Sequence, residues 1–211
     1  MAFFDFLRPT AAKTAIRQMP IFPLNTVLFP GGVLGLQVFE ARYLDMVTAC
    51  LRQQSPFGIC LAATGPAGDP HPEPLAIGTL AEILTADMAQ AGILQLRVRG
   101  GARFRIRSRE RQADGLWRAE IELFADVPPL APPAERLHLL PLLMRIVNDL
   151  GPEKMPEPHA YDDAEWVSYR LTEILPVQNL AKQKLLELEN PLVRLEILDR
   201  YLREHGLLGK N

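Results

Sequence analysis

Residues 19–32 have the sequence MPIFPLNTVLFPGG, in which three prolines and a pair of glycines are set among large apolar side chains. Proline lacks a backbone donor and fixes φ, so within a sheet it is confined to edges, bulges and strand starts. Short apolar pieces bounded by Pro and Gly therefore predict two brief strands, Ile21–Leu24 and Val33–Val38, joined by a tight apolar connection.

The sequence from about residue 19 to residue 127 predicts strands, turns and one helix. The helix is expected over 40–52, where Leu44, Val47 and Leu51 fall on one face. Residues 64–74 lack periodicity and predict a loop, and the Asp-Gly pair within 112–115 is typical of a hairpin turn. Further strands are expected at Ala76–Thr85, Ile93–Arg99, Arg103–Arg109 and Trp117–Phe124. Several short strands with one early helix indicate a small, partly open β-barrel or a sandwich.

Beyond residue 127 the pattern becomes helical. The sequence PPLAPP at 128–133 predicts a stiff, extended connector. Residues 134–150 predict a helix that Pro141 either kinks or divides into two pieces, followed by a Pro-rich loop at 151–159. Asp162 and Glu165 have the spacing of a capping box, which predicts the start of a helix that ends at Pro176. The apolar stripe expected on that helix is Ala164, Val167, Leu171 and Ile174.

Leucines recur three or four residues apart in the last part of the chain, at Leu185, Leu188, Leu192, Leu195, Leu198 and Leu202. Asn190-Pro191 divides this part into two helices, with Asn190 as N-cap and Pro191 at the first helical position. Gly206 is expected to end the second helix in a left-handed conformation. The stripe predicts core packing rather than a partner surface, since an isolated helix gains little until its apolar face is buried.

Composition limits the class of protein. The chain has 211 residues, 48% of them hydrophobic, and a formal net charge of −2, which argues against general attraction to nucleic acid or to an anionic membrane. Cys50 and Cys60 are the only cysteines and predict buried free thiols in a reducing compartment. No apolar run reaches the ~18 residues that span a bilayer. We therefore expect a cytoplasmic protein with no membrane partner, in which residues 1–18 form a loosely held arm or a short helix.

Catalytic motifs are absent from the sequence. The serines Ser55, Ser108 and Ser168 lie in no Gly-x-Ser-x-Gly elbow, and the four histidines lack metal-ligand spacing. No phosphate-binding glycine loop is present. The sequence therefore predicts no catalytic residue, metal or cofactor. A hydrolase with a dispersed active site stays a third possibility, which requires a polar cleft with perturbed titrating groups.

Residues 97–111 hold seven arginines, all at odd positions, and one acid, so this segment carries +6 and the rest of the chain −8. Because strand side chains alternate, one face holds the arginines while Leu96, Val98, Phe104 and Ile106 face the core. Gly100-Gly101 allows a bend. The strip is either a solvated strand face, paired with Glu120 and Glu122, or a positive surface for acidic peptide, nucleic acid or a partner protein. Aromatic residues for base stacking are few, which disfavours RNA.

Residues 19–43 resemble the opening of the Lon protease N-terminal domain, a PUA-like substrate-binding domain with the pattern LPxFPLxxVLFPGGxLxLxxFExRY. Every fixed letter is matched except the first, which is Met19. Gly100, Arg103 and Ile106 fit the family pattern V-x-G-x-x-R-x-x-I. The family's LE and P/V…RL positions near its end are matched within 186–195, so the likeness covers about 19–205.

The resemblance implies an α+β fold: a PUA-like, partly open β-barrel at 19–127, the connector 128–133, a helical subdomain at 134–206 and a tail at 207–211. It implies a non-catalytic module that binds polypeptide segments or a partner protein, as an adaptor, because the ATPase and serine–lysine peptidase domains of Lon have no counterpart here. The alternative is a nucleic-acid or ribonucleoprotein binder that uses the arginine strip. The resemblance does not specify an oligomeric state.

Two segments supply the candidate binding residues. The apolar connection either fills the core or exposes a large side chain that captures unfolded, hydrophobic polypeptide. Arg103 is expected to pair with a carboxylate such as Glu40 and so to hold the early helix against the barrel. The candidate ligand-binding residues are Phe22, Leu28, Phe29, Arg97, Arg99, Arg103, Arg105, Arg107 and Arg109.

Overall fold

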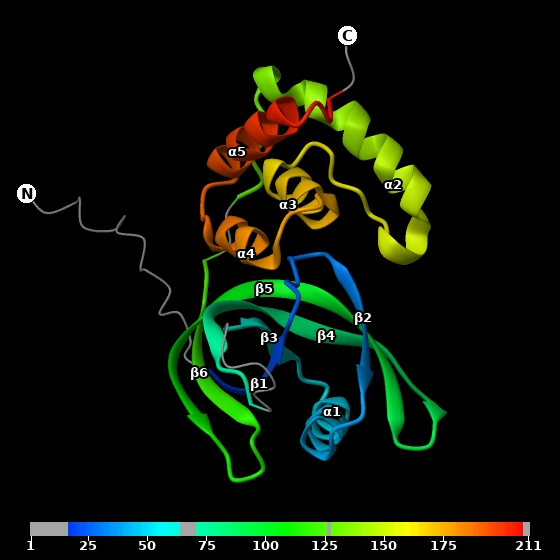
Figure 1. Cartoon of the computed structure of the whole chain (residues 1–211), viewed down its shortest axis with the longest axis vertical. Coiled ribbons are helices and arrows are strands. Elements are labelled where there is room, and N and C mark those ends of the chain that lie inside the picture. The colour runs from blue at the N-terminus through cyan, green and yellow to red at the C-terminus, as the bar shows by residue number, and fades with distance from the viewer. Residues whose placement is uncertain (1–16, 64–70, 126–127, 209–211) are drawn as a thin grey trace, which may run out of the picture.

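The computed structural model describes residues 17–63, 71–125 and 128–208, and it stacks a helical portion on a curled sheet (Figure 1). The predicted N-terminal arm lies mostly outside the described residues. Its last two residues do not belong to an arm, because Arg17 and Gln18 pair with Ile121 and Glu120 as part of the first strand.

The described residues form a mixed sheet of six strands in the order β2-β5-β4-β3-β1-β6, and β6 also pairs with β5. The β5–β6 pairing joins the two sides of the curled sheet in a ring β5-β4-β3-β1-β6, whereas β2, among the described strands, pairs only with β5 and lies outside this ring. The six-stranded sheet as a whole is therefore not a closed barrel. The predicted α+β class and PUA-like, partly open barrel are confirmed. The strands are β1 (Arg17–Leu24), β2 (Val33–Val38), β3 (Phe57–Ala62), β4 (Pro74–Gln90), β5 (Ile93–Arg111) and β6 (Trp117–Leu123).

Strand β5 joins two segments that the sequence predicts as separate strands. The register with β4 shifts between Thr79, opposite Arg103, and Ala81, opposite Gly100, so β5 carries an extra residue at this bend. Gly100 also meets the β1–β2 connection: its N–H donates to Gly32 O at 2.8 Å, and its carbonyl accepts from Gly31 N at 2.7 Å. A Cβ at Gly100 would overlap the backbone carbonyl of Phe29. The predicted bend is therefore also the crossing point of two chain segments.

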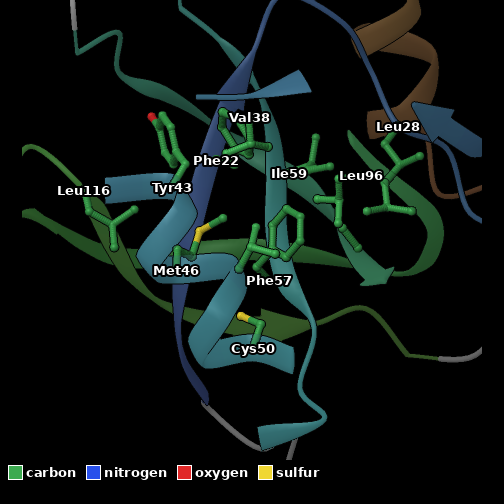
Figure 2. Close-up of a cluster of buried hydrophobic side chains, with 13 residues drawn as sticks. Phe22, Leu28, Val38, Tyr43, Met46, Cys50, Phe57, Ile59, Leu96 and Leu116 are labelled. Atoms are coloured by element: carbon green, nitrogen blue, oxygen red, sulfur yellow. The ribbon is translucent and has the colours of Figure 1, made fainter. Parts of the chain in front are cut away.

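Helix α1 (Ala41–Gln53) closes one end of the curled sheet and packs its side chains into the main apolar cluster (Figure 2). Its buried face is Tyr43, Met46, Val47 and Cys50. The predicted stripe is wrong at Leu51, which is 46% exposed. The ring of Tyr43 stacks on Phe22 at 3.9 Å between centroids, so contact with β1 turns the helix one residue away from the expected face.

The helical portion follows the connector 128–133. Pro141 begins a second piece, as one of the two expected alternatives, because it lies in the first turn of α2. Gly151, at φ +72°, breaks α2 at the start of the predicted loop. The cap of α3 is Asp163 rather than the predicted Asp162, since its carboxylate accepts from Glu165 N at 3.1 Å. The elements are a 3₁₀ helix (Ala134–Leu139), α2 (Leu140–Lys154), α3 (Ala164–Ile174), α4 (Asn179–Glu187) and α5 (Pro191–Glu204).

The leucine stripe of α4 and α5 lies in a second apolar core, as predicted. Leu195 and Leu198 are almost fully buried there, and Leu188 and Leu192 pack against the same cluster. The predicted caps are also present: Asn190 Oδ1 accepts from Leu192 N at 2.9 Å, and Gly206 has φ +62°.

The carboxylate of Asp199 links two helical elements at the edge of this second core. Asp199 Oδ1 lies 2.7 Å from His138 Nε2 and accepts from Arg203 Nε at 2.9 Å. Asp199 Oδ2 pairs with Arg136 at 3.2 Å. Burial raises the pKa of Asp199, but the hydrogen bonds from His138 and Arg203 outweigh it, and the net effect lowers the pKa. Asp199 therefore ties the 3₁₀ helix to α5.

Candidate functional site

The three apolar candidates of the β1–β2 segment are buried. Phe22 is 8% exposed, Leu28 3% and Phe29 0%. Of the two alternatives for this segment, core filling is confirmed, and exposure of one of these side chains to capture unfolded polypeptide is wrong. A Pro-bounded loop can bury every large residue here because two bodies cover it, the sheet on one side and the helical portion on the other (Figure 1).

The connection is where the helical portion rests on the sheet. Phe29 meets the ring of Tyr169 on α3 at 5.7 Å between centroids. Val27 and Leu186 belong to the same buried cluster, which joins residues of both portions. We call this contact region, from Val27–Phe29 to Tyr169 and Leu186, the junction. It is apolar at its centre, and arginines from both portions line its rim.

Arg103 lies at the junction and is only 5% exposed. The predicted pairing of Arg103 with Glu40 is wrong. Nη1 of Arg103 instead donates to Leu186 O at 2.7 Å and to Leu188 O at 3.0 Å, at the end of α4. The guanidinium lies 4.7 Å from the ring centroid of Phe124. Arg103 therefore fastens β5 to the helical portion rather than to α1.

Arg194, on α5, is a buried arginine that the residue pattern alone does not single out. Its Nε donates to Leu185 O at 2.9 Å and its Nη1 to Ser168 Oγ at 2.8 Å. Its guanidinium lies 4.0 Å from the Tyr169 ring centroid. Burial lowers the pKa of Arg194, and the positive charge of Arg103 adds to this effect. The only sequence signal was its place in the family's terminal Arg-Leu pair.

A third buried arginine, Arg170 on α3, holds the turn at Pro30. Its Nη2 donates to Pro30 O at 2.7 Å, and its Nη1 pairs with Glu173 Oε2 at 3.1 Å. Burial raises the pKa of Glu173 to about 7, although Arg170 and Lys182 both lower it. A Cβ at Gly32 would overlap the Glu173 carboxylate, so the second glycine of the opening motif allows the close contact with α3.

The remaining arginines of the predicted strip do not form one continuous free surface. Arg107 pairs with Glu122 on β6, as one expected alternative, whereas Glu120 accepts from Ser108. Arg105 lies 3.7 Å from Glu189. Three further members of the strip have other neighbours: Arg97 donates to Glu153 O, Arg109 pairs with Glu73, and Arg99 lies opposite Glu82 in the β4–β5 register.

Two neighbouring hollows open on the arginine face of β5 at the edge of the junction. The first, about 300 Å³, lies between the Gly100–Ala102 bend, Arg103, Phe124 and Glu165 of α3. The second, about 320 Å³, is lined by Arg105, Arg107, Phe124 and the acids Glu122 and Glu189. Both include Phe124 and Ala125. We call the pair the junction cleft.

Across residues 17–63, 71–125 and 128–208, no group of three or more His, Cys, Asp or Glu side chains is placed to hold a metal ion. In the same ranges no helix has the length and hydropathy needed to cross a bilayer. The two cysteines are free and buried, and burial raises the pKa of both thiols.

Two solved structures of similar proteins share this fold. A solved structure titled Lon N-terminal domain protein from Xanthomonas campestris is 35% identical, has a TM-score of 0.74, and covers 88% of this chain and 99% of its own. The N-terminal domain of Mycobacterium avium complex Lon protease, at 19% identity and a TM-score of 0.63, shares the fold over 90% of this chain and 100% of its own.

Two curated relatives match more distantly. One is a LON peptidase N-terminal domain and RING finger protein of Schizosaccharomyces pombe, 26% identical over 85% of this chain and 44% of that protein. The other is the protein cereblon of Danio rerio, 27% identical over 54% of this chain and 27% of that protein. The chain thus spans less than half the length of either relative.

The family model of the ATP-dependent protease La (LON) substrate-binding domain matches residues 18–204. This range takes in the described strands and helices, from the second residue of β1 to the end of α5. The buried opening motif, the glycine bend of β5 and the arginine-fastened junction thus lie in a chain that belongs to the LON substrate-binding domain family.

Proposed function

We propose that this chain is a non-catalytic module that binds polypeptide, as an adaptor or a partner-binding protein. The observation that carries the proposal is the match of the LON substrate-binding domain model to residues 18–204. The junction cleft supports it, because it offers a groove with both charged and aromatic lining on a rigid two-part scaffold.

The proposal also covers the cellular compartment and the absence of a catalytic role. The two free, buried thiols, Cys50 and Cys60, support a reducing compartment, and we place the protein in the cytoplasm. The absence of phosphate-binding and peptidase motifs from the sequence supports a role without catalysis. The alternative role, binding of nucleic acid by the arginine strip, has less support, because Arg97 and Arg109 bind protein acceptors away from the junction and the strip is not one continuous surface.

The test is a binding titration with a polypeptide that cannot fold. Fluorescein-labelled α-lactalbumin, reduced and carbamidomethylated, is titrated with the full chain and followed by anisotropy, beside the native folded form. Saturable binding of the unfolded form alone is the expected result. Equal binding of both forms, or of neither, would contradict the proposal. A parallel titration with a labelled single-stranded RNA distinguishes the alternative, whose affinity must fall steeply with salt.

A further inference from the structure

The junction cleft presents unused hydrogen-bond donors of Arg103. Only Nη1 of its guanidinium donates to the protein, to the two carbonyls at the end of α4. Nε and Nη2 have no acceptor within the described residues, and neither nitrogen is sealed from solvent. Since Arg103 lines the first hollow, these two donors are available there. The Nε–Nη2 edge of a guanidinium is suited to a carboxylate held by two parallel hydrogen bonds.

Positive charge is in excess at this point. The positive charge of Arg103 helps to lower the pKa of Arg194, and neither arginine forms an ion pair with a carboxylate of the described residues. The first hollow has one acidic lining residue, Glu165, which accepts a hydrogen bond from the Tyr169 hydroxyl at 3.2 Å. Two buried cations and one carboxylate leave a local charge of about +1 that an added anion would neutralise.

The second hollow continues the same chemistry along β5. Arg105 and Arg107 line this hollow, two and four residues beyond Arg103 on β5. Arg105 leaves the same face of the strand as Arg103, about 7 Å away, and a bulge between Ile106 and Ser108 interrupts the alternation at Arg107. The partner of Arg105 is weakly held, since Glu189 is 68% exposed and lies 3.7 Å away, whereas Arg107 pairs closely with Glu122, which is 30% exposed. Exposed ion pairs contribute roughly 0–1 kcal/mol, so an incoming carboxylate can replace such a partner at little cost.

Phe124 divides the two hollows and supplies an apolar surface between the cations. Its ring lies 4.7 Å from the Arg103 guanidinium and 5.3 Å from that of Arg105. Arg103 and Arg105, two residues apart on β5, with the Phe124 ring against both guanidinium groups, match a second extended chain whose side chains alternate with the same period. The match favours an internal segment that passes through both hollows over a single terminal carboxylate.

We infer that the junction cleft binds an extended acidic segment of a partner polypeptide. Carboxylates at alternate positions contact Arg103, Arg105 and Arg107, and an apolar side chain of the segment rests on Phe124. The inference rests on the proposed function and specifies its substrate class: unfolded or extended regions with Asp or Glu at every second position.

The experiment measures the affinity of the full chain for three short fluorescein-labelled peptides by anisotropy. The first is amidated at its C-terminus and has glutamate at alternate positions around a central phenylalanine. The second replaces each glutamate by glutamine, and the third keeps the glutamines but has a free C-terminal carboxylate. The acidic peptide is expected to bind at least about tenfold more tightly than the glutamine peptide.

Variants assign the binding to the cleft. Arg105→Gln/Arg107→Gln is expected to weaken binding of the acidic peptide at least about fivefold. The matched control, Arg99→Gln/Arg111→Gln, removes the same charge from the same strand outside the cleft, and binding should stay within about twofold of wild type. Arg103→Lys, which keeps the charge but loses the two-donor edge, should weaken binding about tenfold, with circular dichroism verifying its fold.

Several results would overturn the inference: equal affinity for the acidic and glutamine peptides, preference for the free carboxylate, equal loss in the control variant, or displacement of the acidic peptide by single-stranded RNA. Its failure is distinguishable from failure of the proposed function. A chain that binds unfolded α-lactalbumin but does not prefer glutamate retains the proposed function and loses the inference. A chain that binds neither loses both.

Discussion

Replacement of Arg103 by methionine tests how the two portions are held together. Met retains much of the apolar stem, so the change removes the guanidinium without opening a large cavity. Two hydrogen bonds are lost. Leu188 O keeps a donor in Arg194, but Leu186 O loses its side-chain donor at the buried junction.

The magnitude follows from these contacts. A hydrogen bond from a charged donor contributes about 1.5–3 kcal/mol, and the contact with Phe124 adds about 0.5–2 kcal/mol. Removing the guanidinium also removes the free-energy cost of burying its charge, and this gain offsets part of the sum. We expect Arg103→Met to lower the free energy of unfolding by about 3 kcal/mol, and the melting temperature by about 6–12 °C for a chain of this size.

The assay is urea unfolding followed by tryptophan fluorescence. The chain has two tryptophans, Trp117 on β6 and Trp166 on α3, so the variants Trp117→Phe and Trp166→Phe each report on one portion. In the otherwise wild-type chain both probes should show the same midpoint, because the apolar junction couples the portions. Arg103→Met should lower both midpoints.

Arg105→Met is the control, since that side chain is 44% exposed and its ion pair is long. Its effect should stay within about 0.5 kcal/mol of wild type. The reasoning is refuted if Arg103→Met costs less than about 1 kcal/mol, or no more than the control.

Three further predictions concern stability, each measured by chemical denaturation. Gly100→Ala should lower the free energy of unfolding by about 3 kcal/mol or more, because the added Cβ would overlap the Phe29 carbonyl. The control Gly35→Ala places its Cβ in open space and should lower it by less than about 0.5 kcal/mol, and equal losses for the two variants would contradict this prediction. Folding raises the pKa of Glu173 from 4.5 to about 7, so between these two pH values the folded state binds more protons than the unfolded state. The free energy of unfolding should therefore fall as the pH rises from 5 to 8, and Glu173→Gln should flatten that slope. An unchanged slope would show that Glu173 is not the group responsible. Asp199→Asn should cost about 1–3 kcal/mol at pH 7, since the donors around it lose a charged acceptor, and a neutral effect would show that the cluster is not stabilising.

Local sequence signals predicted the elements well and their partners poorly. Val33–Val38 matches β2 residue for residue, and Asn190 caps α5 as expected, because strand bounds and caps depend on neighbours in the chain. The resemblance supplied the barrel and the helices that follow it. The β5 segments merged into one strand because a single extra residue absorbs the glycine bend.

The junction was not predictable from the same signals. The alternation of strand side chains correctly predicts that Arg103 lies on the outer face of β5. The same pattern does not show that the helical portion covers this face at Arg103. The pairing with Glu40 therefore failed, and Phe29 was wrongly offered as an exposed side chain. Arg194 was missed because an arginine within a leucine stripe ordinarily indicates the solvated side of a helix. Its burial depends on carbonyls at the end of α4.

The long sequence separation across the junction has a consequence during synthesis. Pro30 and Arg170, which are hydrogen-bonded to each other, lie 140 residues apart in the chain. At about 5–20 residues per second, roughly 7–28 s pass on the ribosome between the two. During that interval the apolar residues Val27–Phe29 have left the ribosome without α3 to cover them. Every nascent copy therefore displays the opening motif as an exposed hydrophobic stretch, and its biogenesis should depend on chaperones that hold such stretches until the last helices emerge.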